Sequence, residues 1–140
     1  MTPSFPAFLK TTTTACFLNP SGQPVAHDVE VRTDPVTGRT ARVTAARSDE
    51  KEPGAERLPP PPPDAGDIAC CPFCPPQRER LTPTFTPSFA PEGRLVVGHS
   101  VLFPNLFPYG GHSAVSLFND RHFIEIGTAS PASYADCLVN

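Results

Sequence analysis

The prolines set the first limit on how this chain can fold. Of 140 residues, 20 are prolines, roughly three times the usual share of about 5%. Proline lacks the amide hydrogen that helix interiors and central strands require, and its ring fixes φ. Five consecutive prolines occupy 59–63, and prolines recur at every fourth position of 83–91. A packed core must therefore come from the remaining segments.

Length and charge narrow the class of protein. A chain of this length fits one domain. It carries 11 basic and 14 acidic side chains, a formal charge of −3, and no lysine or arginine run that could neutralise a series of phosphates. We therefore expect no nucleic-acid partner.

The N-terminus and the hydropathy pattern bear on localisation. The first 20 residues contain two early prolines and no apolar run of the roughly 7 to 15 residues that a signal peptide needs. No other stretch approaches the roughly 18 apolar residues of a membrane span. We expect a cytoplasmic protein without a membrane partner. Thiols stay reduced there, so clustered cysteines suggest metal binding or catalysis before disulfides.

A hairpin is predicted in the first third of the chain. Residues 26–32 place Val29 and Val31 on one face with polar residues between them, the period of a half-buried strand. The turn sequence at 34–38 combines aspartate, proline and glycine, so 38–47 can return as the partner strand. The charged and proline-rich segment 48–66 is then a linker or a surface loop.

The last third has the strongest strand signals. β-branched and aromatic residues favour strands at 94–103, 113–118 and 121–127, with a turn-rich segment between the first two. Ser130 followed by Pro131 is typical of a helix N-cap, and no signal ends that helix before the last residue. The predicted fold class is α+β, mainly antiparallel sheet with a C-terminal helix.

The sequence CCPFCPP at residues 70–76 contains the most specific chemistry. Cys71 and Cys74 form a C-x2-C pair that can aim two thiolates at one tetrahedral ion. A redox pair and structurally incidental cysteines are the alternatives. A thioredoxin-type pair needs a strand before it and a helix directly after, which Pro75 and Pro76 discourage. Five cysteines cannot all pair within the chain. Further metal ligands would come from the histidines: His27, His99, His112 and His122.

Three other polar residues can be explained by a structural role or by a functional one. By spacing alone, His122 is typical of an exposed histidine after a turn. Arg47 and Asn105 lie among apolar or small residues. Such residues can contact a ligand, but more often they end a strand or form a turn.

The order of these motifs resembles the N-terminal half of the galactose-1-phosphate uridylyltransferase branch of the histidine-triad (HIT-like) superfamily. The similar segments are GRTARVTAAR, CPFCP, LTPTF, GRLVVGHSVLFPNLFPY and HSAVSLFNDRHF, and the resemblance as a whole spans about residues 28–138. In that family an arginine-bearing hairpin precedes a C-P-x-C-P zinc knuckle. A later strand of the pattern S-x-V-x-x-F-x-x-x-H brings the third zinc ligand.

The resemblance implies specific roles for the residues that match. Cys71, Cys74 and His122 become zinc ligands, although such a donor set also suits iron. Asn105 falls where the family contacts the nucleoside, and Arg47 falls where an arginine meets the phosphates. Cys70 has no counterpart, which leaves open which of the two adjacent thiolates binds. A nucleotide sugar or sugar phosphate would be the ligand of a full-length parent, with a homodimer as one arrangement.

The chain also departs from the family. Its members use a histidine of an H-P-H segment as the nucleophile, and this sequence contains no H-x-H. We therefore expect an N-terminal extension at 1–25 and an incomplete HIT-like domain at 26–140 that is inactive alone. It would contribute zinc and nucleotide-phosphate binding to a nucleotidyltransferase. The alternative is a catalytically inactive, zinc-stabilised module that binds nucleotide or protein. An unrelated zinc ribbon would need a second C-x2-C, which the sequence lacks.

Overall fold

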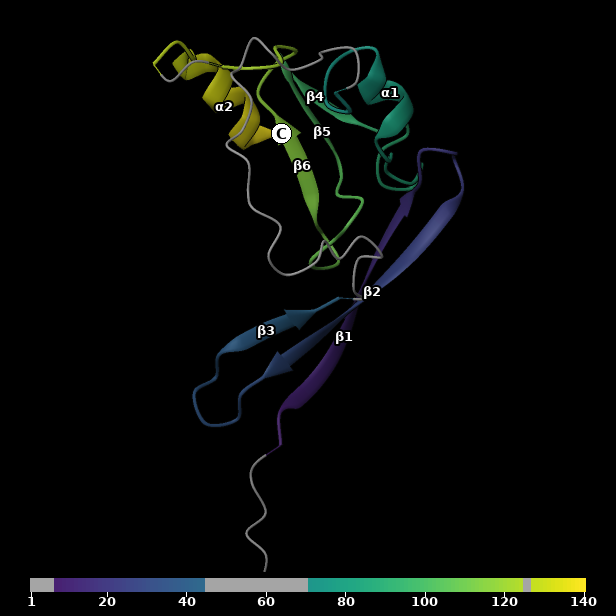
Figure 1. The fold of residues 1–140 in the computed structure, drawn as a ribbon, viewed down its shortest axis with the longest axis vertical. Helices are drawn as coiled ribbons and strands as arrows, with labels where there is room; N and C mark the ends of the chain where they lie inside the picture. The colour runs from purple at the N-terminus through teal and green to yellow at the C-terminus, as the bar shows by residue number, and fades with distance from the viewer. Residues whose placement is uncertain (1–6, 45–70, 125–126) are drawn as a thin grey trace, which may run out of the picture.

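The computed structural model describes residues 7–44, 71–124 and 127–140. These residues form two antiparallel three-stranded sheets and a C-terminal helix (Figure 1), which confirms the predicted α+β class. Arg47, Cys70 and the predicted linker 48–66 lie outside the described residues. No helix within the described residues is long and apolar enough to cross a bilayer.

The first sheet is a long ribbon with a short third strand. It consists of β1 (Leu9–Leu18), β2 (Pro24–Thr33) and β3 (Thr40–Val43), in the order β1-β2-β3. The pairing of β1 with β2 runs the full length of both strands. In Figure 1, β1 and β2 reach from the lower part of the molecule up toward the second sheet. This sheet therefore has an extensive backbone ladder.

The turn between β2 and β3 is the one that the sequence predicts. The Asp34 carboxylate accepts hydrogen bonds from the Val36 amide at 2.9 Å and the Thr37 hydroxyl at 2.6 Å. Gly38 has a φ of 71°, in the left-handed region that favours glycine. The side chain of Asp34 thus organises the turn, and the hairpin prediction is confirmed.

Strand β1 lies within the predicted N-terminal extension, residues 1–25, where no strand was expected from the sequence. Residues 9–18 pair with β2 along the full length of the strand. The sequence signal was weak because four consecutive threonines at 11–14 are polar, although their β-branched side chains suit a strand. The β1–β2 turn depends on Asn19, whose side-chain oxygen accepts from the amides of Ser21 and Gln23 at 3.0 and 2.9 Å.

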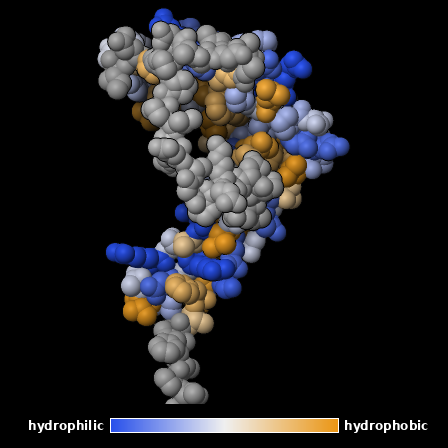
Figure 2. All heavy atoms as spheres, in the orientation of Figure 1, coloured by the Kyte–Doolittle hydropathy of each residue, from blue (hydrophilic) through white to orange (hydrophobic). Residues whose placement is uncertain are grey.

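The two faces of the first sheet differ in polarity. Ala15, Phe17 and Val29 are buried on one face. On the other face the Thr14 hydroxyl donates to Asp28 across the strands at 2.6 Å. Figure 2 shows apolar side chains in separate groups over both sheets rather than in one continuous surface.

The second sheet has shorter strands around a buried centre. Its order is β4 (Leu95–Val97), β5 (Ser100–Pro104) and β6 (Ala114–Leu117). The central strand β5 supplies Phe103, whose side chain is 1% exposed and is the largest fully buried one described. The second sheet therefore contains the principal packed core.

Helix α2 (Pro131–Val139) docks on the second sheet through polar contacts. The Ser130 hydroxyl accepts the Ser133 amide at 3.1 Å, which confirms the predicted N-cap. Near the end of the helix, the side-chain nitrogen of Asn140 donates to the Ser100 hydroxyl at 3.1 Å. Ser116 lies 3.0 Å from the Cys137 sulfur. These contacts attach the C-terminal end of α2 to strands β5 and β6.

Two local predictions differ from the structure. The described residues 121–124 of the expected strand 121–127 are not a strand. The reason is a turn in which the Asn119 side chain accepts the Arg121 amide at 2.9 Å. A short helix, α1 (Gln77–Leu81), also follows the prolines, with Pro76 as its N-cap residue. Proline is tolerated at a helix start because the first amides need no intrahelical acceptor.

A single pair of backbone bonds connects β1 to the proline-rich segment before β4. Leu18 and Thr84 form an isolated bridge, with N–H to O distances of 2.9 and 3.0 Å in the two directions. Thr84 thus pairs with the end of β1 and ties the segment between α1 and β4 to the first sheet.

Candidate metal centre

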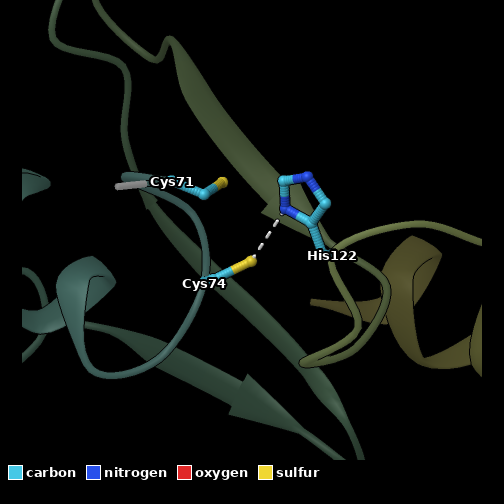
Figure 3. Close-up of side chains that lie close together, drawn as sticks. All are labelled: Cys71, Cys74 and His122. Atoms are coloured by element: carbon cyan, nitrogen blue, oxygen red, sulfur yellow. Dashed lines mark hydrogen bonds between the residues drawn. The ribbon is translucent and has the colours of Figure 1, made fainter. Parts of the chain in front are cut away.

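Two cysteines and one histidine converge beside the second sheet. The ligand atoms of Cys71, Cys74 and His122 all lie within 4.8 Å of one another. The Cys74 sulfur is 3.2 Å from His122 Nδ1. Figure 3 shows the two thiols on one loop and the imidazole reaching toward them from another. The predicted ligand set is thus brought together, and it could hold a metal ion.

A tight turn places the two thiols on the same side of the first loop. We call residues 71–76 the knuckle. The Cys74 amide donates to the Cys71 carbonyl at 3.3 Å, and the Cys74 carbonyl accepts the Arg78 amide of α1 at 2.9 Å. Between the cysteines, the Phe73 ring stacks on the core residue Phe103 with centroids 6.3 Å apart. The knuckle is therefore fixed to both α1 and the core.

The third donor comes from the turn after β6. Asn119 closes this turn, and the Asp120 carboxylate accepts a hydrogen bond from Arg78 Nη1 at 2.8 Å. His122 follows two residues later and is exposed, whereas Cys74 is only 3% exposed. The site thus has a buried sulfur on one side and a solvent-facing imidazole on the other.

The surroundings of Cys74 disfavour its thiolate when no metal is bound. Burial raises the pKa of the Cys74 thiol, and the neighbouring Cys71 thiol raises it further, while the positive charge of Arg78 acts in the opposite direction. Both cysteines are free thiols. Metal binding must therefore displace a proton from Cys74.

The separation of the Cys74 and His122 donors is compatible with a shared tetrahedral ion. Zinc bonds of about 2.3 Å to sulfur and about 2.1 Å to nitrogen place a sulfur and a nitrogen about 3.6 Å apart in a tetrahedron. The observed 3.2 Å between Cys74 Sγ and His122 Nδ1 needs a shift of only a few tenths of an ångström. Thiolate and imidazole are also the ligand types that zinc prefers. The described part of the chain supplies three donors to this group.

The remaining histidines do not join this group. Among the described residues, His27 lies in β2, His99 in the turn between β4 and β5, and His112 just before β6, and none belongs to the cluster. Of the four candidates that the sequence offered, the structure selects His122.

Asn105 has a local structural role. Its side-chain nitrogen donates to the Ser113 hydroxyl at 3.4 Å, and its side-chain oxygen accepts the Phe107 amide at 3.0 Å. The residue thus holds the turn that follows β5. Contact between Asn105 and a nucleoside stays a prediction, as does the phosphate role of Arg47, which lies outside the described residues.

Sequence reasoning missed the charged residues around the knuckle. The Arg78 side chain is 9% exposed and bonds both Asp120 and Glu79. Burial alone would lower the pKa of Arg78, but the bonds to these two carboxylates prevail and raise it. Arg94 Nε donates to Glu79 at 2.9 Å, and its guanidinium lies 5.3 Å from the Phe103 ring centre. No sequence motif marks these residues, because Arg78 and Asp120 lie 42 residues apart and Arg94 and Glu79 lie 15 residues apart.

A redox role was disfavoured because Pro75 and Pro76 discourage a helix directly after the cysteine pair, and the structure removes this objection. A helix does follow the cysteine pair, since α1 begins directly after Pro75 and Pro76. The strand that a thioredoxin-type site needs before the pair would fall in 45–70, outside the described residues. A redox role for Cys71 and Cys74 therefore stays untested.

Comparisons of the chain with protein-family models, with curated proteins and with solved structures give no match.

Proposed function

We propose that Cys71, Cys74 and His122 bind one zinc ion that fixes the knuckle to the turn after β6. The observation that carries this proposal is the convergence of Cys74 and His122, 48 residues apart in sequence, to 3.2 Å. Two thiolates and an imidazole form a structural zinc donor set when a fourth ligand completes the tetrahedron. Iron accepts the same donors, so metal analysis decides the identity.

The zinc would act mainly as a cross-link. A metal that binds the folded chain and not the unfolded one stabilises the fold in proportion to the logarithm of its concentration. The strands of the second sheet are three to five residues long, so a bond between distant segments contributes much to holding this part of the chain together.

We further propose that the chain is the N-terminal portion of a nucleotidyltransferase resembling UDP-glucose:hexose-1-phosphate uridylyltransferase. The support is that the resemblance requires His122 to join the C-x2-C pair, and the two do meet. In this role Arg47 holds phosphate, Asn105 contacts the nucleoside, and the zinc stabilises the site. The sequence has no H-x-H, so these residues bind and do not supply a nucleophile.

The second candidate is a catalytically inactive, zinc-stabilised module that binds a nucleotide or a protein. The missing H-x-H favours it. Binding of UDP-glucose to the zinc-loaded chain, weakened in Arg47→Met, supports a nucleotide ligand. Absence of binding in calorimetry contradicts the transferase proposal. Incubation with UDP-glucose should give no covalent adduct in mass spectrometry, and an adduct would reveal a nucleophile.

The zinc proposal is tested by comparing two cysteine substitutions. Cys74→Ser removes a buried donor, whereas Cys16→Ser changes an exposed free cysteine in β1. We expect one zinc per wild-type chain by elemental analysis, and a joint loss of zinc and melting temperature in Cys74→Ser only. Zinc content that is unchanged in Cys74→Ser contradicts the proposed site.

A further inference from the structure

A buried guanidinium lies between the two loops that supply the metal donors. The Arg78 side chain is 9% exposed, and a buried charge is costly unless it is paired and hydrogen-bonded. Its Nη1 donates to Asp120 at 2.8 Å, and its Nε donates to Glu79 at 3.2 Å. The glutamate is its neighbour in α1, whereas the aspartate is 42 residues away. The Asp120 bond is therefore the one that joins distant segments.

The backbone of Arg78 is fixed to the knuckle. Its amide donates to the Cys74 carbonyl at 2.9 Å. Its carbonyl accepts the Thr82 hydroxyl at 2.7 Å and the Arg94 guanidinium at 3.2 Å. These hydrogen bonds fix the backbone of Arg78 relative to Cys74, so the base of the Arg78 side chain has a defined position beside the knuckle.

The other end of the ion pair lies next to the third donor. Asp120 precedes His122 by two residues, in the turn that Asn119 closes. His122 itself is exposed, and its Nδ1 contacts the Cys74 sulfur. A bond that holds Asp120 therefore limits how far the imidazole can move from the thiols.

We propose that the Arg78–Asp120 pair is the positioning element of the metal centre, holding His122 within reach of Cys71 and Cys74 before the ion arrives. This inference rests on the proposed metal site. A donor that is already in place loses little conformational entropy when the metal binds. Residues that orient metal ligands through hydrogen bonds typically change metal affinity by about 10- to 100-fold, and we expect an effect in this range for Asp120.

A purely structural ion pair would behave differently. The Asp120 side chain is 67% exposed, and the Arg78 guanidinium keeps its bond to Glu79 when Asp120 is removed. We therefore expect the exposed Asp120 carboxylate to contribute little to folding stability. If Asp120 mattered only as a surface charge, its removal would leave metal affinity unchanged. If it positions His122, removal changes metal affinity much more than it changes the stability of the metal-free chain.

The experiment compares metal binding by Asp120→Ala with wild type and with Arg80→Met, an exposed change in the same helix α1. Zinc competition with a chromophoric chelator gives the affinity. The absorption of the cobalt(II)-loaded chain reports how many thiolate and imidazole donors are bound. We expect about 10- to 100-fold weaker zinc binding in Asp120→Ala, with weaker tetrahedral cobalt bands, and wild-type behaviour in Arg80→Met.

A charge swap separates positioning from general damage. Asp120→Arg should weaken zinc binding, and adding Arg78→Asp should recover part of the affinity. Zinc affinity and cobalt spectra in Asp120→Ala that equal those of wild type overturn the inference while leaving the zinc site intact. A wild-type chain that binds no zinc overturns the proposed function itself. Circular dichroism of metal-free Asp120→Ala verifies that the variant folds.

Discussion

The two sheets of this molecule are held together in different ways. In the first sheet, β1 and β2 pair along ten residues each, so the backbone ladder supplies most of the contacts. In the second sheet, the strands have three, five and four residues. There, side chains from distant segments complete the structure. The comparison teaches that a short sheet depends on cross-links that a long hairpin does not need.

Arg94 illustrates the second kind of stabilisation. Its guanidinium donates to the carbonyl oxygens of Arg78 and Pro83, both at 3.2 Å, and lies over the ring of Phe103. One side chain thus connects α1, the segment before β4 and the core. The proposed zinc would add a further connection of the same type, between the knuckle and the turn after β6.

Removal of zinc should have the largest effect and should affect the two sheets unequally. A ligand at about 1,000 times its Kd stabilises the folded state by about 4 kcal/mol, which a chelator would abolish. We expect amide hydrogen exchange to accelerate in α1 and in β4 to β6, while the β1–β2 ladder keeps its protection.

Cys74→Ser is the control for the chelation experiment, because it should exchange at the faster rate with or without the chelator. Equal acceleration in both sheets would contradict the comparison, since it would mean that they open as one unit.

Substitution of the α2 cap should have an intermediate effect on the second sheet. Ser130→Ala removes the acceptor for the Ser133 amide and should lower the free energy of unfolding by about 1 kcal/mol. Urea unfolding followed by circular dichroism measures this change. The exposed Ser21→Ala is a matched control, because Ser21 contributes only its backbone amide to the β1–β2 turn. Equal stability of the two variants would show that the cap does not support α2.

The smallest effect concerns the turn of the first sheet. The Thr37 hydroxyl and the Val36 amide hold the pKa of Asp34 below its usual value of 3.8. A lowered folded pKa adds stability above pH 3.8, and this stability is lost as pH falls through the lowered value.

Because Asp34 is only half-buried in a surface turn, we expect only local loosening at acid pH. It should appear as faster exchange of the Val36 and Gly38 amides in NMR, while the second sheet is unaffected. Asp34→Asn, which cannot titrate, should show no such pH dependence. A pH dependence that persists in Asp34→Asn would assign the effect to another group.

Local sequence signals predicted the local parts of the fold. The Asp34 turn and the Ser130 cap depend on residues within three positions of one another, and both appear as expected. Strand β1 was missed because its threonines lack the apolar alternation of Val29 and Val31. In the expected strand 121–127, the described residues 121–124 are not a strand. Their apolar content concealed the turn that Asn119 makes just before them.

The candidate site was only partly predictable. C-x2-C spacing brings Cys71 and Cys74 together in any tight turn, but nothing local to the sequence selects His122 from four histidines. That choice came from the resemblance to a known family, and the geometry agrees with it. The Arg78–Asp120 pair could not be predicted, since it depends on how helix α1 packs against the turn after β6, 42 residues further along the chain.

The bridge between Leu18 and Thr84 bears on the order in which the chain folds. The β1–β2 hairpin needs only nearby residues and can form within about 1 to 10 μs, like other hairpins. The bridge instead closes a loop that includes β2, β3 and the knuckle, and such long closures carry an entropic cost that delays them. The contact between β1 and the segment before β4 should therefore be among the last to form as the chain folds.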